Sequence, residues 1–363
     1  MGRTPPLLER IGTRALLRWS AGRPVAGPQL VHLLDEDERA AMRRIERLAL
    51  LRAATAGALS ALAAGLTEAA VRPWEESDPV LFWGAVGGVS ALAAVGEIAF
   101  LSWDSLRSAH RLSLAAGLVL DETLERQQTL AILARAALEV PSPPDAVAGV
   151  NPLKETQRWR LLLAGLAYKL KVSATNLIFK QLLRRALGRA AVRAWLQFVS
   201  IPVTAAWNAF ACARVLRELR VRVFGASLAD DVVRRLLPGD ALVEPLLAEA
   251  LLRAVGACVV RSADPHPNLA HLFEALERRT GASRPLHLDD PKRFLTSLGA
   301  LPAELRVTAL RLLRAAVVCD GRIARREREL LDEAAAAAGL NHDGRELEGE
   351  RRRVLAGEAL ALA

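Results

Sequence analysis

Residues 53–96 read AATAGALSALAAGLTEAAVRPWEESDPVLFWGAVGGVSALAAVG. This stretch holds two long uncharged runs, and one short acidic turn separates them. A helix needs roughly 20 mostly apolar residues to cross a bilayer. Both runs reach that length when their apolar flanks are included, over 48–71 and 79–103. The sequence therefore predicts a two-helix transmembrane hairpin over 48–103, and the rest of the chain is interpreted outward from it.

The charges around the hairpin predict its orientation. Arginines precede the first run and follow the second, whereas the turn carries one Arg against three acidic residues. Because loops rich in Arg and Lys stay in the cytosol, we expect both termini to be cytosolic at a bacterial inner (cytoplasmic) membrane. Trp74, Trp83 and Trp103 fall near the expected membrane surfaces, which indole rings favour. Two alternatives stay open: a hairpin buried in a large soluble bundle, and a functional intramembrane carboxylate at Glu97 instead of an interfacial one.

Small residues repeat at every fourth position of the first run and predict close helix packing. Such faces let two helix backbones approach each other in lipid. We therefore expect the hairpin to pack on itself or on a copy of itself, the second case giving a homo-oligomer. The predicted packing residues are Gly57, Ala61 and Gly65 in the first helix and Gly84 and Gly88 in the second.

The composition indicates an all-α protein with a small membrane part. The chain has 363 residues, of which 25% are charged, too many for a polytopic transporter. Ala and Leu dominate and aromatic residues are scarce, as is typical of helical proteins. Asp35 followed by Glu38 resembles a capping box and predicts a helix start there. Outside the hairpin we expect amphipathic N-terminal helices over 1–47, a helix and Pro-rich linker over 104–150, basic membrane-associated helices over 151–225 and a helical bundle over 226–363.

The basic helices hold the whole positive excess of the chain. Residues 151–225 carry 14 basic and 2 acidic side chains, whereas the net charge of the full chain is +9. Each Arg or Lys near an anionic membrane contributes about 1 kcal/mol of attraction, so we expect anionic lipid as a partner of this segment. The predicted lipid contacts are Arg184, Arg185, Arg189 and Arg193.

The uncharged run 194–213 inside the basic segment is compatible with several structures. A surface or re-entrant helix bent at Pro202 is favoured, because basic residues crowd both ends of the run whereas a span is expected to be asymmetric. A third span and a helix in a soluble core stay open. Nucleic acid is not expected as a partner, because no recognised binding motif is present and the aromatic residues lie apart from the arginines.

Residues 226–363 show seven amphipathic segments and no strand pattern. The sequence LLRA at 251–254 and again at 312–315 begins an apolar stretch that ends near an Asp, Asp264 and Asp320 respectively. We therefore expect a compact α-bundle with a weak internal repeat. The seven segments run approximately over 228–237, 242–261, 267–280, 290–298, 302–318, 323–338 and 343–360.

The stretch LLRAAVVCDGRIARRERELLDEAAAAAGL, residues 312–340, resembles the tellurite-resistance TerB-like domain. The matching features are an apolar helix that closes on Asp-Gly and a following helix with an early Glu and a Leu-rich face, carried by Asp320, Gly321, Ile323, Glu327, Leu330 and Leu331. The resemblance implies an all-α bundle with a repeated helical unit, and it suggests Asp320 and Glu327 as ligands of a divalent metal. Four arginines around the turn disfavour a cation there. The other interpretation is that Asp320 caps the next helix and Gly321 takes a positive φ.

The sequence predicts tethering rather than chemistry. No P-loop, zinc-protease or nucleophile motif is present, and Cys212, Cys258 and Cys319 show no paired spacing. Catalysis by His266 or His271 would need a deep polar pocket that joins a His to a carboxylate. We expect a non-enzymatic bacterial inner-membrane protein that holds a cytosolic TerB-like bundle at the membrane for stress response or for binding an unidentified cytosolic protein. The alternative is a divalent-metal-binding sensor that uses the Asp-Gly turn, and no other cofactor is expected.

Overall fold

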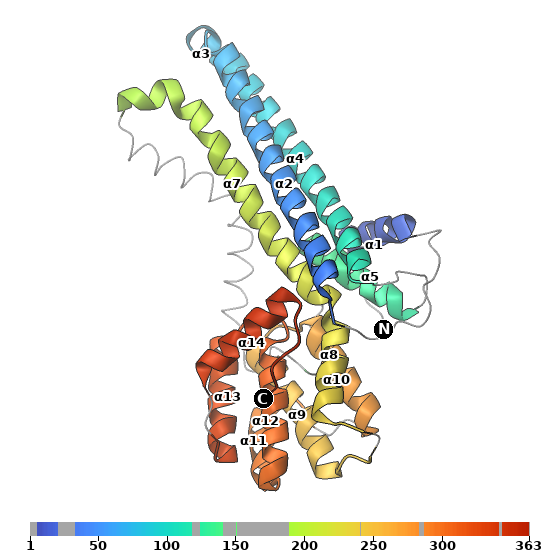
Figure 1. Cartoon of the computed structure of the whole chain (residues 1–363). Coiled ribbons are helices and arrows are strands. Elements are labelled where there is room, and N and C mark those ends of the chain that lie inside the picture. The colour runs from blue at the N-terminus through green and yellow to red at the C-terminus, as the bar shows by residue number, and fades with distance from the viewer. Residues whose placement is uncertain are drawn as a thin grey trace. The chain divides into compact units, whose positions relative to one another are not determined.

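The computed structural model describes residues 6–20, 33–117, 124–140, 150, 189–239, 241–282, 287–340 and 343–362. Within these ranges the regular structure is entirely α-helical, which confirms the predicted all-α class (Figure 1). The predicted Pro-rich linker and most of the basic segment lie outside the described residues. The chain divides into two compact units. We call Glu46–Ser105 with Thr156–Arg214 the apolar unit, and Met1–Ile45, Leu106–Glu155 and Val215–Ala363 the bundle unit.

The apolar unit contains the predicted hairpin. Its helices are α2 (Glu36–Val71), α3 (Trp74–Ser77), α4 (Pro79–Ala115) and α7 (Arg189–Val223), of which α2, α4 and α7 extend into the bundle unit. Two of these, α2 and α4, are long and apolar enough to span a membrane. Helix α2 begins where the sequence predicts, because Asp35 and Glu38 form a reciprocal capping box: the Glu38 amide donates to Asp35 Oδ1 over 2.7 Å and the Asp35 amide to Glu38 Oε2 over 2.9 Å.

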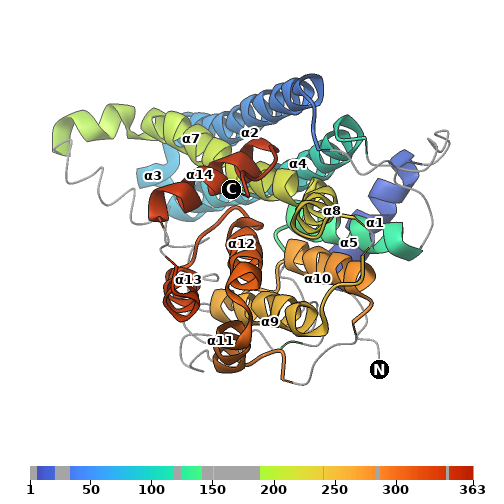
Figure 2. The same cartoon turned by 60° about the horizontal axis from the view of Figure 1, so that its bottom comes forward.

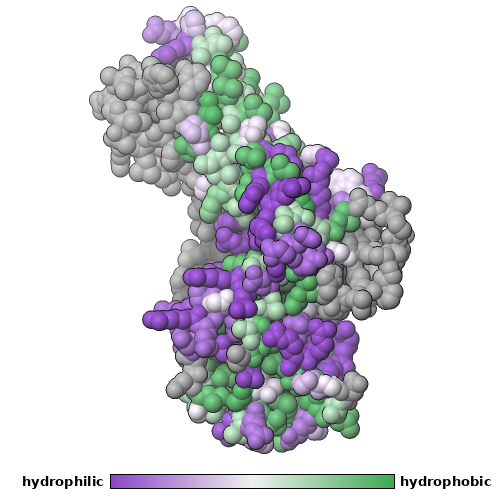
Figure 3. Space-filling view, viewed as in Figure 1, coloured by the Kyte–Doolittle hydropathy of each residue, from purple (hydrophilic) through white to green (hydrophobic). Residues whose placement is uncertain are grey.

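The apolar side chains of the hairpin helices face outward. In the most apolar part of α4 no residue is buried, and in that of α2 only 28% are. Val80, Leu92 and Val95 of α4 are 84%, 74% and 67% exposed. Figure 3 shows this surface as a green band over α2, α4 and α7, with a hydrophilic tip at α3. Helices in a soluble core usually bury such side chains.

The N-terminal part of the bundle unit pairs α1 (Leu7–Ser20) with α5 (Leu124–Ala137). Arg135 Nε lies 2.8 Å from Glu9 Oε2, and both side chains are largely buried. A Cβ added to Gly12 would lie 3.0 Å from Ala134 Cβ, so the absence of a side chain lets the two helices approach closely. The predicted amphipathic N-terminal helix therefore exists, and one face of it packs on protein.

Seven helices complete the bundle unit, one for each predicted segment. They are α8 (Gly225–Leu236), α9 (Pro245–Ser262), α10 (Pro267–Thr280), α11 (Pro291–Ala300), α12 (Ala303–Val318), α13 (Arg325–Ala338) and α14 (Gly344–Ala356). Figures 1 and 2 show α9 and α12 side by side within this bundle. Nearly every residue of α9 from Leu247 to Val260 is buried. Helix α10 covers α8 and α9, and α13 covers α9, α11 and α12.

The internal echo corresponds to two helix pairs. Helices α9 and α10 form one pair, α12 and α13 form the other, and the first helices of the two pairs pack together. The arginine of each LLRA sequence pairs with a glutamate, within α9 for Arg253 and between α12 and α14 for Arg314. Arg253 lies 2.8 Å from Glu249, and Arg314 lies 2.9 Å from Glu350. The repeat noticed in the sequence therefore marks the two halves of the bundle core.

Candidate functional site

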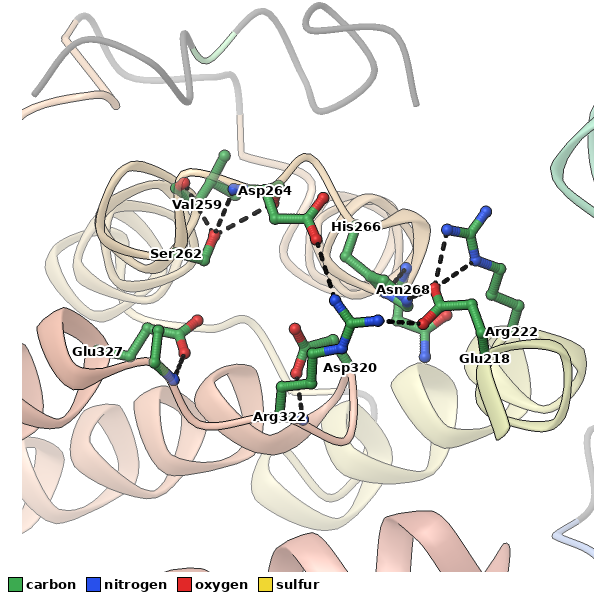
Figure 4. A network of polar contacts seen from close by, with 11 residues as sticks. Glu218, Arg222, Val259, Ser262, Asp264, His266, Asn268, Asp320, Arg322 and Glu327 are labelled. Atoms are coloured by element: carbon green, nitrogen blue, oxygen red, sulfur yellow. Dashed lines mark hydrogen bonds and ion pairs between the residues drawn. The ribbon is translucent and has the colours of Figure 1, made fainter. Parts of the chain in front are cut away.

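A polar cluster in the bundle unit joins the last turns of α7 to the α9–α10 loop and the α12–α13 loop (Figure 4). Glu218 of α7 is at its centre. Its Oε1 lies 3.1 Å from His266 Nε2 and accepts from Arg222 Nε over 2.8 Å. Its Oε2 accepts from an Arg322 guanidinium nitrogen over 2.9 Å. Three donors thus meet one carboxylate, and the two halves of the bundle core each supply one of them.

The α9–α10 loop places His266 at the start of α10. Helix α9 ends at Ala263, which has a left-handed backbone (φ 54°), and His266 is the N-cap of the next helix. His266 Nδ1 accepts from the Asn268 amide over 3.3 Å, so the ring proton is on Nε2 and points at Glu218. Both ring nitrogens are engaged and the side chain is buried. His266 therefore has no free nitrogen for the hydrolytic chemistry left open above.

The α12–α13 loop is closed by the two predicted turn residues. Asp320 Oδ1 accepts from the Arg322 amide over 2.7 Å, and Gly321 has φ 72°. The positive φ predicted for Gly321 is confirmed. Asp320 stabilises the turn itself, because α13 begins only at Arg325. The start of α13 is instead fixed by Glu327, whose Oε2 accepts from the Ala324 amide over 2.7 Å.

Burial makes two carboxyls of this loop weaker acids than usual. Burial raises the pKa of Asp320 to about 6, against the opposing effects of the Arg322 amide hydrogen bond and the Arg322 charge. Burial, reinforced by the charge of Asp320, raises the pKa of Glu327 to about 8. Burial also acts to raise the pKa of Glu218, but His266, Arg222 and Arg322 outweigh it and hold the pKa well below its usual range. At neutral pH Glu218 is therefore ionised, whereas Glu327 is mostly protonated.

The buried cysteines beside Glu327 are not nucleophiles. Cys258 Sγ lies 3.6 Å from Glu327 Oε1. Burial, with the neighbouring carboxyls, raises the pKa of both Cys258 and Cys319 well above the usual thiol value. Reactive cysteines need a low pKa and access to solvent, so these two belong to the packed core.

The predicted metal ligands Asp320 and Glu327 are both engaged by backbone amides. Among the residues that the structure describes, no group of three or more His, Cys, Asp or Glu side chains is arranged to hold a metal ion. Asp320 and Glu327 each use an oxygen to accept a backbone amide, while Ca²⁺ or Mg²⁺ needs about six or more oxygen ligands.

The predicted packing residues of the hairpin differ in burial between the two helices. Gly57, Ala61 and Gly65 of α2 are buried, whereas Gly84 and Gly88 of α4 are exposed. A Cβ added to either of the two α4 glycines would meet no described atom within 4 Å. The small-residue face of α2 meets α7 at Gly57, where an added Cβ would lie 2.6 Å from Asn208 Nδ2.

The predicted lipid-contacting arginines fall at the edge of the described part of the chain. Arg189 and Arg193 lie in the first turns of α7, while Arg184 and Arg185 lie outside the described residues. Sequence reasoning missed Glu218 altogether, since its partners His266 and Arg322 are 48 and 104 positions away.

No family model matches this chain, and neither a curated protein nor a solved structure matches it. The likeness to the TerB-like domain therefore rests on the residues of the α12–α13 region quoted above.

Proposed function

We propose that this chain is a non-enzymatic bacterial inner-membrane protein that holds a TerB-like helical bundle at the cytosolic face of the membrane. The observation that carries the proposal is the outward-facing apolar surface of α4. In water, burying apolar surface contributes about 25 cal/mol of stabilising free energy for each Å², and an exposed surface lacks that contribution. In a bilayer the same side chains contact acyl chains, and the exposed surface needs no protein partner.

The charges support a cytosolic bundle. Arg107 and Arg47 are exposed at the ends of α4 and α2 that lead into the bundle unit, while the α3 turn is acidic. By the positive-inside rule the α3 turn is extracytoplasmic and both termini are cytosolic.

A surface of the bundle unit supports partner binding. The loop before α9 exposes Leu242 almost fully, at 99%, and Leu246 in the first turn of α9 is exposed by more than half. Arg279 of α10 holds this loop by donating to the carbonyls of Leu237, Gly239 and Ala241 over 2.6–3.2 Å. A loop that is braced while it presents leucine to solvent suits a preformed contact for a cytosolic protein, at which stress signalling would act.

Cysteine accessibility in intact cells tests the proposal. Cys212 is replaced by Ser, and the buried Cys258 and Cys319 remain. A membrane-impermeant thiol reagent should label Ser77→Cys in the α3 turn from outside. It should label Ala300→Cys at the exposed end of α11 only after the membrane is permeabilised. A protein that fractionates as soluble, or an Ala300→Cys that labels in intact cells, would overturn it.

A divalent-metal sensor at the Asp-Gly turn is the second candidate. The observation in its favour is that Asp320 and Glu327 are buried with raised pKa, and a bound cation would stabilise their ionised forms. Mn²⁺ or Ca²⁺ added to the full-length protein in detergent should then raise its melting temperature. The increase should disappear in Asp320→Asn. No shift at millimolar metal rejects this candidate.

A further inference from the structure

Helix α1 of the bundle unit has two faces of different character. One face packs on protein: Gly12 and Leu16 are buried, and Glu9 pairs with Arg135 of α5. The opposite face is exposed along the length of the helix, and it combines aliphatic with basic side chains. Its exposed residues are Leu7, Leu8, Arg10, Ile11, Arg14 and Arg18.

The aliphatic side chains of the exposed face gather in the first half of α1. Leu7, Leu8 and Ile11 are 67%, 55% and 51% exposed. Leu7 and Ile11 are four positions apart, so they lie on the same side of the helix. Single apolar residues are ordinary on a protein surface, whereas a group of them beside basic residues on one helix is typical of contact with a lipid surface.

The arginines of the same face have no acidic partner among the described residues. Arg10, Arg14 and Arg18 follow one another at intervals of four and form a row along the helix. None of the three makes an ion pair with another described side chain. Exposed arginines elsewhere in the bundle unit do so, such as Arg278 with Asp230. A row of guanidinium groups without carboxylates to neutralise it suits the phosphates of anionic lipid.

Contacts with α4 place α1 just beyond the apolar part of that helix. A Cβ added to Gly12 would lie 3.2 Å from Leu106 Cδ2, and the rings of Trp19 and His110 are 6.0 Å apart. Trp103 is exposed at the predicted end of the span. At about 1.5 Å of rise per residue, Leu106 lies about 4.5 Å further along α4 than Trp103, and His110 about 10 Å further. The polar layer of a bilayer is about 5–8 Å deep on each side, so these contacts fall within it or at its edge.

The same contacts give α1 a direction. Gly12 meets α4 at Leu106, and Trp19 meets it one helical turn further from the apolar part, at His110. The aliphatic residues of α1 precede Gly12, so the aliphatic end of the exposed face is the end nearer to the apolar part of α4. Long arginine side chains can keep their charge among headgroups while their stems cover apolar surface.

We propose that α1 is an interfacial helix that binds anionic phospholipid of the cytosolic leaflet. Its three exposed aliphatic side chains insert at the boundary of the acyl chains, and its three exposed arginines contact lipid phosphates. This inference rests on the proposed membrane function, which places α4 in the bilayer and the bundle unit in the cytosol. It adds a lipid contact distinct from the arginines predicted at the start of α7, and the new contact ties the bundle unit itself to the membrane surface.

Fluorescence of the full-length protein in vesicles tests this contact. Ile11→Cys in the Cys212→Ser background carries an environment-sensitive thiol dye, and the vesicles contain phosphatidylcholine and phosphatidylglycerol. A lipid-borne nitroxide should quench the dye severalfold, and aqueous iodide should quench it weakly. The same dye at Ala300→Cys, on the exposed end of α11, should show the opposite pattern. Quenching of Ile11→Cys by iodide as strong as that of Ala300→Cys would overturn the inference and leave this face of α1 to a protein partner.

A third dye position separates this inference from the proposed function. Leu92→Cys lies on the exposed apolar surface of α4. If the lipid-borne nitroxide quenches Leu92→Cys but not Ile11→Cys, the interfacial helix is rejected and the membrane hairpin stands. If it quenches neither position, the membrane proposal itself fails.

Two triple variants of equal net charge test the arginines. Replacing the three exposed arginines of α1 by Gln should lower the lipid quenching of Ile11→Cys severalfold in vesicles that contain phosphatidylglycerol. The matched control replaces three exposed arginines of α13 and α14 by Gln, and its quenching should equal that of the parent; these are Arg328, Arg345 and Arg353. Equal quenching in both variants, or equal quenching of the parent with and without phosphatidylglycerol, would contradict recognition of anionic lipid.

Discussion

Replacing Glu327 by Gln should make the bundle unit more stable at alkaline pH and leave it almost unchanged at acidic pH. The amide keeps the shape of the side chain, and its oxygen can still accept from the Ala324 amide. What it removes is a carboxyl whose pKa is raised to about 8 by burial and by Asp320. Asp264 and the thiol of Cys258 are the other titratable groups that act on it.

The sign follows from proton binding. Between the ordinary glutamate pKa near 4.5 and the folded value of about 8, the folded protein binds one more proton than the unfolded chain. Stability is therefore lost as the pH rises, by about 1.4 kcal/mol for each pH unit in that window. The wild type should lose roughly 4–5 kcal/mol relative to Glu327→Gln by pH 9. At about 2–4 °C per kcal/mol, the gap in melting temperature should reach roughly 10 °C.

The assay is thermal unfolding of the full-length protein in detergent, followed by circular dichroism at several pH values between 5 and 9. Comparing two variants at the same pH removes effects that both share. Glu304→Gln on the exposed first turn of α12 is the control, and it should follow the wild type. A gap that stays constant with pH, or that favours the wild type above pH 8, would refute a buried protonated carboxyl at Glu327.

Three further outcomes follow from the contacts. Glu218→Gln should destabilise the bundle unit by about 2–4 kcal/mol, because it leaves the nearly buried Arg222 without a counter-charge, and a melting temperature equal to the wild type would contradict the cluster. Arg279→Ala should speed proteolysis within 237–246, whereas Arg278→Ala, which removes only an exposed pair with Asp230, should not. Asn208→Leu should lower the unfolding midpoint of the apolar unit in micelles by an amount equivalent to about 1 kcal/mol, and an increase would mean that the hydrogen bond to Glu97 does not stabilise the contact between α7 and α4.

Local signals in the sequence were sufficient to predict the helices. They were not sufficient to predict the long-range contacts between them. The start of α2 could be predicted because both capping residues lie within four positions of each other. The seven bundle helices could be delimited because Pro, Gly and Asp end or begin them in predictable ways. Glu97 and Asn208, by contrast, are 111 positions apart, and nothing in the spacing of either residue indicates the other.

The same distinction between local and long-range signals explains which features of the candidate sites could be predicted. The Asp-Gly turn was visible as a turn, since only glycine adopts φ 72° there at little expense. Whether Asp320 caps, ligates or simply closes the turn depends on Arg322 and on the start of α13, which the structure supplies.

The inverted polarity of the apolar unit is the strongest argument against a soluble hairpin. Within that unit Asp104 is almost fully buried beside Arg52, and Asn208 is buried beside Glu97. At the same time Val80, Leu92 and Val95 lie on the surface. Water favours the opposite arrangement, in which carboxylates and amides stay solvated and leucine is enclosed. Polar groups satisfied between helices with apolar groups outside are what a hydrocarbon solvent selects. The proposed lipid environment would account for both halves of the pattern, whereas a missing protein partner would explain only the exposed half.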